Sequence, residues 1–155
     1  MSLNASIPAA CEAGNPAVDK HSNKQRSRNM AAIRSGGMKP EMMVRSLVHG
    51  MGYRYRLHAR DLPGKPDLVF RPRKRVIFVH GCFWHQHGRA ACKDGRAPKS
   101  NLGYWAGKLA RNVERDARNL DDLEAMGWKA LVLWECDVLK GGATLAAQVQ
   151  RFLGR

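Results

Sequence analysis

The chain has 155 residues, which is enough for one domain with a hydrophobic core and short for two. Its 27 Lys and Arg residues outnumber its 13 Asp and Glu residues, and the resulting net charge of +14 favours a polyanionic partner such as nucleic acid. No apolar run approaches the about 18 residues of a membrane span, and residues 1–16 lack the pattern of a signal peptide. We therefore expect a cytoplasmic protein without a membrane partner, whose four cysteines are better explained by metal than by disulfides.

The N-terminal part is predicted to be a tail followed by a basic arm. Residues 1–21 show no periodicity and few large apolar groups, so a flexible tail is expected. Ser22 followed by Gln25 matches a helix capping box, and the helix expected over residues 22–35 is basic with few apolar residues. Such an arm could grip DNA, although a solvated helix has the same pattern. Residues 22–155, arm included, are predicted to form a single domain.

A second helix and three strands are predicted next. Pro40 can open the helix because its missing N–H is not needed there, and Gly50 and Gly52 end it. The buried stripe of this helix is expected at Met42, Met43, Leu47 and Met51. Extended segments follow at 53–57, 67–70 and 75–79, and the third is nearly all apolar, as in strands buried on both faces.

The C-terminal half is predicted to contain a polar loop and three regular elements. Residues 80–100 hold two of the four Cys and three of the six His residues and are expected to be a loop. A helix over 101–126, broken at most once, has an apolar side at Trp105, Leu109, Val113, Leu120 and Leu123. A buried strand at 128–134 and a closing helix at 142–153 complete the order. This order predicts an α/β fold with a mixed central β-sheet flanked by helices.

Three cysteines and a histidine form a candidate zinc site, because thiolates and one imidazole are the donors that structural zinc prefers. The set consists of Cys82, His87, Cys92 and Cys136. Cys136 follows the last predicted strand and would fix the polar loop to the sheet. Spacing leaves His85 open as a ligand in place of His87, and buried free cysteines are the alternative to a metal.

An aspartate and two histidines form a candidate hydrolytic site. Asp67 begins one predicted strand and His80 ends the next, so neighbouring strands would place both at one end of the sheet. Phosphodiester hydrolysis needs a carboxylate for a hard cation, a base for the attacking water and a group that steadies charge on phosphorus. Asp67, His80 and His85 could supply these roles, although a lone Asp at a strand start is more often a turn former.

Five motifs together resemble the very short patch repair endonucleases. They are Arg28-Asn29-Met30, Leu62-Pro63-Gly64-Lys65-Pro66-Asp67, His80-Gly81-Cys82-Phe83-Trp84-His85, Arg111-Asn112-Val113-Glu114-Arg115-Asp116 and Trp134-Glu135-Cys136. They occur in the family's order, and the run from His80 to His85 is specific to it. The resemblance implies a restriction-endonuclease-like core with a zinc-stapled loop and a magnesium-dependent DNA-nicking activity.

The resemblance also implies roles for individual residues. The catalytic set would be Asp67 and the backbone carbonyl of Val79 as Mg²⁺ ligands, His85 as base, His80 at the phosphate, and Glu41 in support of the catalytic histidine and the water at the metal. Cys82, His87, Cys92 and Cys136 match the zinc ligands. The chain departs from some relatives at Val79, where they carry Thr, and in a longer interval between His87 and Cys92.

The residues expected to contact DNA follow from the same resemblance. They are Met30 as a minor-groove wedge, Phe83, Trp84 and Trp105 as major-groove wedges, Lys108 and Asn112 as readers of the mismatched bases, and Arg111 and Arg115 as phosphate contacts. Wedging between base steps costs a few kcal/mol, and a weakly stacked mismatch lowers that cost. Core packing is the alternative for Trp105.

The expected function is hydrolysis of the phosphodiester 5′ to the thymine of a G:T mismatch left by deamination of 5-methylcytosine. We expect a monomer that acts on double-stranded DNA in the bacterial nucleoid, with other mismatch-repair proteins and a repair polymerase as further partners. One alternative is a restriction-type nuclease without mismatch preference, against which the aromatic wedges argue. The other is a zinc-stabilised DNA-binding module, which would not need Asp67, His80 and His85.

Overall fold

The structure is a computed structural model that describes residue 25, residues 37–96, residue 99 and residues 101–154. The predicted tail, Met30 and, apart from helical Gln25, the basic arm lie outside the described residues. The elements are α2 (Lys39–Gly50), β1 (Arg56–Leu57), β2 (Leu68–Phe70), η1 (Arg71–Arg73), β3 (Arg75–His80), α3 (Cys82–His85), α4 (Leu102–Ala125), β4 (Lys129–Trp134), α5 (Glu135–Lys140) and α6 (Gly142–Leu153). Within these ranges, no helix is long and apolar enough to cross a membrane.

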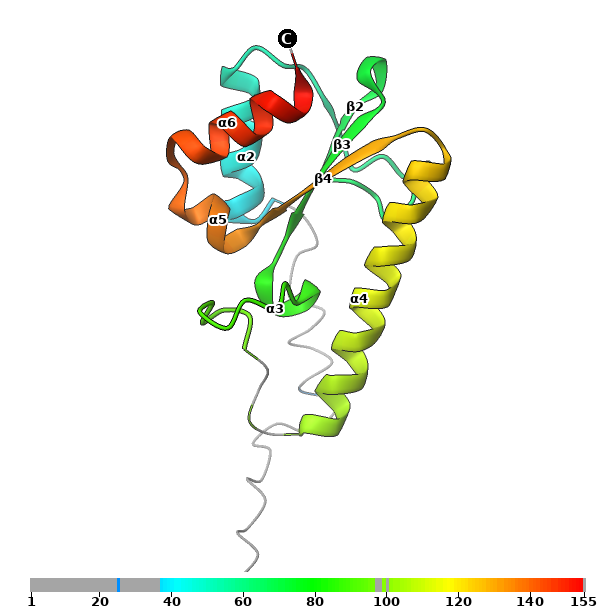
Figure 1. Cartoon of the computed structure of the whole chain (residues 1–155), viewed down its shortest axis with the longest axis vertical. Helices are drawn as coiled ribbons and strands as arrows, with labels where there is room; N and C mark the ends of the chain where they lie inside the picture. The colour runs from blue at the N-terminus through cyan, green and yellow to red at the C-terminus, as the bar shows by residue number, and fades with distance from the viewer. Residues whose placement is uncertain (1–24, 26–36, 97–98, 100, 155) are drawn as a thin grey trace, which may run out of the picture.

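The described strands form one mixed sheet in the order β1-β2-β3-β4. β1 to β3 are antiparallel neighbours, whereas β4 pairs parallel to β3 from Arg75↔Lys129 to His80↔Trp134. Figure 1 shows α2, α5 and α6 grouped on one side of the sheet and the long helix α4 on the other. The predicted mixed sheet flanked by helices is therefore confirmed.

The core consists of two apolar layers, one on each face of the sheet. Leu68, Phe70 and Ile77 pack with buried residues of α2, α5 and α6. Val69, Val76 and Phe78 face the other way and pack with Leu123 of α4 and with Leu62. Successive strand residues point to opposite faces, so two covered faces need a continuous apolar run. This explains the almost wholly apolar sequence of β3.

Several details differ from the sequence-based expectations. In α2 the fully buried residues are Val44 and Val48. Of the predicted stripe, Met43, Leu47 and Met51 are partly buried against the core, whereas Met42 is 49% exposed. Val113 is also exposed, since α4 continues past the sheet towards α3 (Figure 1). β4 is an edge strand, and only Leu133 in it is buried.

Two helices lie where none was expected, and the long helix has no interruption. A single helical turn, α3, occupies part of the expected polar loop, and α5 follows β4 directly. α4 runs without a break through its described length. The two short helices begin at the ends of the parallel neighbours β3 and β4, so they bring Cys82 and Cys136 to the same end of the sheet.

Candidate active site and zinc cluster

A tight turn places Asp67 at the start of β2. Gly64 in this turn has a φ of +72°, and a Cβ there would approach Phe78 and Asn119 to 3.1 Å, so glycine suits both the backbone and the close contact. The Asp67 Oδ2 atom accepts a 2.7 Å hydrogen bond from the backbone N–H of Val79 near the end of β3. The prediction that Asp67 meets the end of the next strand is confirmed.

His80, His85 and Asp116 form the second part of the site. His80 ends β3 and is 8% exposed, and the turn into α3 brings the His85 ring onto it, with centroids 3.9 Å apart and planes 12° from parallel. His85 Nδ1 is hydrogen-bonded to Asp116 Oδ2, which comes from α4. A carboxylate at Nδ1 favours the proton on that nitrogen, so Nε2 carries the lone pair that can accept a proton.

Burial gives two of these groups unusual proton affinities. Burial and, less strongly, the charge of His85 lower the pKa of His80 to about 4, although Asp116 opposes both effects. Burial raises the pKa of Asp67, the hydrogen bond from Val79 opposes this rise, and the Glu41 carboxylate adds to it. His80 is therefore neutral at pH 7, whereas burial and the Glu41 carboxylate disfavour the charged form of Asp67.

Glu41 lies beside Asp67, in a third group with His58. The Glu41 carboxylate is buried against the Arg45 guanidinium one helical turn later, and Glu41 Oε1 is 3.2 Å from His58 Nε2. A ligand atom of each of Glu41, His58 and Asp67 lies within 4.8 Å of the other two. Among the described residues, the carboxylate in contact with His85 is Asp116.

Sequence analysis missed the roles of Asp116 and His58. Asp116 stands four residues after Asn112 and eight after Lys108, so it shares a helix face with both, and this spacing was a usable signal. His58 follows a two-residue strand and no motif marks it. Its position becomes informative only once β1 is paired with β2.

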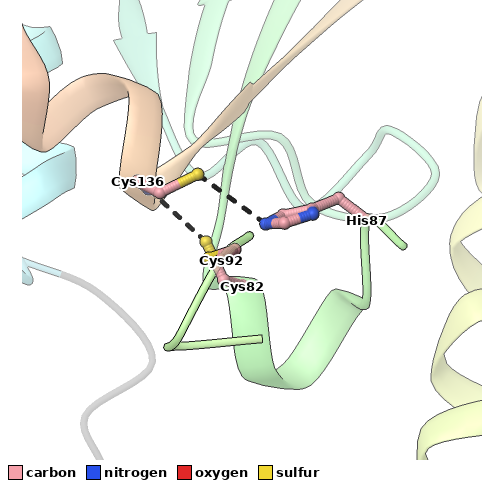
Figure 2. A group of neighbouring side chains, drawn as sticks. All are labelled: Cys82, His87, Cys92 and Cys136. Atoms are coloured by element: carbon pink, nitrogen blue, oxygen red, sulfur yellow. Dashed lines mark hydrogen bonds between the residues drawn. The ribbon is translucent and has the colours of Figure 1, made fainter. Parts of the chain in front are cut away.

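The predicted zinc ligands come together. Figure 2 shows Cys82, His87, Cys92 and Cys136 facing one another, and their donor atoms lie within 4.8 Å. Tetrahedral zinc with bonds of about 2.1–2.3 Å separates its ligands by about 3.5–3.8 Å, and Cys136 Sγ is 3.7 Å from His87 Nε2. His87 rather than His85 belongs to this group, so the donor set fits a zinc ion.

An aromatic patch lies where α3 meets the start of α4. Its rings are those of Phe83, Trp84, Tyr104 and Trp105, with neighbouring centroids 4.8–6.1 Å apart. Lys108 Nζ lies 5.8 Å from the ring centroids of both Trp84 and Tyr104. Asn112 Nδ2 donates a 3.2 Å hydrogen bond to the Trp84 carbonyl. Trp105 thus packs in this patch and not in either layer of the core.

Arg111 and Arg115 are exposed on α4 beside this patch. Arg115 Nη2 is 3.6 Å from Asp116 Oδ1, so one of the two guanidinium groups lies next to the His85–Asp116 pair. Together with Lys108 they give the face that carries the aromatic patch a positive charge. Basic and aromatic side chains in one patch are typical of nucleic-acid contacts.

Comparisons with known proteins agree with this arrangement. The family model described as DNA mismatch endonuclease Vsr matches residues 18–91, which include Asp67, His80 and His85. The type II nicking enzyme V.XorIIP of Xanthomonas oryzae is 47% identical over 136 residues, 88% of this chain and 97% of that one. The DNA mismatch endonuclease Vsr of Escherichia coli is 40% identical over 119 residues, 77% of this chain and 74% of that one. The chain therefore belongs to the Vsr family of very short patch repair endonucleases, which have a restriction-endonuclease-like fold.

Proposed function

We propose that this protein nicks DNA beside a G:T mismatch by hydrolysing the phosphodiester 5′ to the mismatched thymine, the first step of very short patch repair. The observation that carries the proposal is that Asp67, His80 and the His85–Asp116 pair share one end of the sheet with the aromatic patch. A hydrolytic site beside aromatic wedges suits an enzyme that opens the base stack before it cleaves the backbone.

His85 is the proposed general base. Its Nε2 would take a proton from the attacking water, while the Asp116 carboxylate holds the ring through Nδ1 and stabilises the positive charge that forms. Asp116 acts through His85 and is a positioning residue. His80, neutral and stacked on His85, would donate a hydrogen bond to a phosphate oxygen.

Asp67 and the backbone carbonyl of Val79 are the proposed ligands of Mg²⁺. The Asp67 carboxylate lies beside the Glu41 carboxylate, and such a pair suits a cation, which when bound would supply Lewis-acid stabilisation of charge on the phosphate. The Val79 backbone is fixed by its hydrogen bond to Asp67. A role of the Val79 carbonyl needs no hydroxyl, so Val in place of Thr is compatible with activity.

Zinc is the proposed organiser of the loop that carries both chemistry and recognition. Phe83, Trp84 and His85 all lie between the ligands Cys82 and His87. Cys136 connects this segment to the end of β4, and Arg89 pairs with Asp137 at 2.7 and 2.8 Å beside it. A zinc ion held here would fix the base and the wedges relative to the sheet.

The aromatic patch is the proposed site of mismatch recognition. Phe83, Trp84 and Trp105 would enter the stack from the major groove, while Lys108 and Asn112, already in contact with the patch, would read the bases. Arg111 and Arg115 would bind phosphates, which the excess positive charge of the chain supports. The basic arm over residues 22–35, with Met30, is proposed to act from the minor groove.

A strand-specific nicking assay tests the proposal. The substrates are a labelled G:T duplex and its G:C control, with Mg²⁺, and the proteins are the wild type, Asp67→Ala and Asp61→Ala. Asp61 is an exposed carboxylate in the same turn, paired with Arg71, and serves as the matched control. We expect nicking of the thymine strand by the wild type and Asp61→Ala, and none by Asp67→Ala.

Two other results would contradict the proposal. Cleavage of both duplexes would indicate a restriction-type nuclease without mismatch preference. Tight binding without cleavage of either duplex would indicate a zinc-stabilised DNA-binding module.

A further inference from the structure

We propose that His58 is a third protein ligand of the catalytic cation, bound through Nδ1, and that it shifts the metal preference of the enzyme from Mg²⁺ towards Mn²⁺. This inference rests on the proposed function, because it concerns the cation at Asp67. His58 lies outside the motifs that resemble the family, and its contacts alone point to this role.

The backbone holds His58 against Asp67. β1 pairs antiparallel with β2 through Leu57↔Leu68, so His58 and Asp67 follow as opposite neighbours, and the His58 N–H donates a 3.4 Å hydrogen bond to the Asp67 carbonyl. His58 also has a φ of +46°, a left-handed conformation that is rare for residues with a Cβ and concentrates at functional sites. The strained backbone therefore turns the imidazole towards two carboxylates.

The donor atoms have the spacing of ligands around one cation. Octahedral ligands at about 2.1 Å from a cation are about 3.0 Å apart when adjacent and about 4.2 Å apart when opposite. His58 Nδ1 is 3.9 Å from Asp67 Oδ1, which is closer to the distance between opposite ligands than to that between adjacent ones. On the other side of the ring, His58 Nε2 is 3.2 Å from Glu41 Oε1, and metal-bound histidines commonly give that second N–H to a carboxylate.

Arg45 is the fixed positive charge of this group. Two carboxylates and one guanidinium give −2 + 1 = −1, so Glu41, Arg45 and Asp67 leave a negative charge for a cation to balance. Arg45 Nη2 also lies 2.9 Å from His58 Nε2. When Nδ1 binds a cation, Nε2 keeps its proton, and Arg45 then withdraws from Nε2 to Glu41, with which it is already paired.

An imidazole ligand changes which ion the site prefers. Mg²⁺ is a hard ion that favours oxygen donors, whereas imidazole suits transition-metal ions, and Mn²⁺ accepts both oxygen and nitrogen. A site with Asp67 alone would favour Mg²⁺. A site that adds the His58 nitrogen gains affinity for Mn²⁺ relative to Mg²⁺.

Pulsed electron paramagnetic resonance of bound Mn²⁺ tests the proposal without DNA or turnover. Mn²⁺ alone is added to the zinc-loaded protein, so that His87 stays occupied. We expect ¹⁴N modulation from a coordinated imidazole in the wild type and in His49→Gln, a control on the exposed end of α2. In His58→Asn, a residue that tolerates a positive φ, we expect the modulation to vanish and the Mn²⁺ affinity to fall about tenfold or more.

Two further variants keep the outcomes separate. His58→Asp restores a ligand through oxygen, so it should bind Mn²⁺ without the ¹⁴N signal and raise Mg²⁺-supported nicking relative to Mn²⁺. Persistence of the ¹⁴N signal in His58→Asn would overturn the proposal, while loss of Mn²⁺ in Asp67→Asn would leave the proposed function standing. Mn²⁺ binding that Asp67→Asn does not change would instead refute the cation site of the proposed function itself.

Discussion

The buried, neutral state of His80 makes the stability of this protein depend on pH. Burial and the neighbouring His85 lower the pKa of His80 from 6.5 to about 4. Below pH 6.5 the unfolded chain binds a proton at this residue and the folded chain does not. The stability that neutral His80 contributes above pH 6.5 is therefore lost as the pH falls towards 4. A shift of about 2.5 pKa units at about 1.36 kcal/mol each predicts a total loss of about 3 kcal/mol.

Asp67 acts in the opposite direction. Burial raises its pKa in the folded protein, so acid favours the folded form at this residue, and the stability it contributes is lost as pH rises through that raised pKa. The pH dependence of the wild type therefore sums opposing effects. Replacing His80 by Gln isolates one of them, because Gln keeps a polar side chain of similar length and does not titrate.

The measurement is the free energy of unfolding by urea at pH 7.5 and at pH 5, with zinc bound. Between these pH values the free energy of unfolding of the wild type should fall by about 2 kcal/mol more than that of His80→Gln. The interval that counts runs from 6.5, the ordinary pKa of His, down to pH 5, which is 1.5 pH units at about 1.36 kcal/mol each. His49→Gln, which removes an exposed histidine, should behave as the wild type. An equal loss in wild type and His80→Gln, or an NMR titration of His80 near 6.5, would refute the reasoning.

Three further predictions concern the site. Asp116→Asn should lower the nicking rate by a factor of about 10²–10⁴ with DNA affinity unchanged, because His85 loses the carboxylate that orients it. Asp122→Asn, on the exposed side of α4, is the control. Equal nicking rates in the two variants would argue against a role of the His85–Asp116 pair. Cys136→Ser should bind zinc at least about tenfold more weakly and unfold at a lower temperature, which metal analysis and calorimetry measure. An unchanged zinc content would exclude Cys136 as a ligand. Trp84→Ala should weaken binding to the G:T duplex more than to the matched duplex in a fluorescence titration, whereas equal losses would indicate a general phosphate-binding role for the patch.

The sequence alone was sufficient where the chemistry is local. Strands β2 and β3 are joined by a short turn, so their pairing necessarily brings the start of one to the end of the other, and Asp67 met the end of β3 as predicted. The nearly continuous apolar run typical of strands buried on both faces likewise made β3 recognisable. The four donor residues of the candidate zinc site, which the fold brings together, were also identifiable, because few other roles collect three cysteines and a histidine at the edge of a polar loop.

Tertiary structure decided the partners of each side chain. Spacing left His85 and His87 equivalent, but Gln86 between them adopts a φ of +49° and turns the chain, which sends His85 to Asp116 and His87 to the cysteines. The exposure of Met42 on α2 and the approach of His58 to Asp67 depend likewise on packing between elements. Sequence periodicity shows that an element has an apolar face or carries a side chain able to bind a metal or a proton. Which partner that face or side chain contacts is decided only when helices and strands from distant parts of the chain pack together.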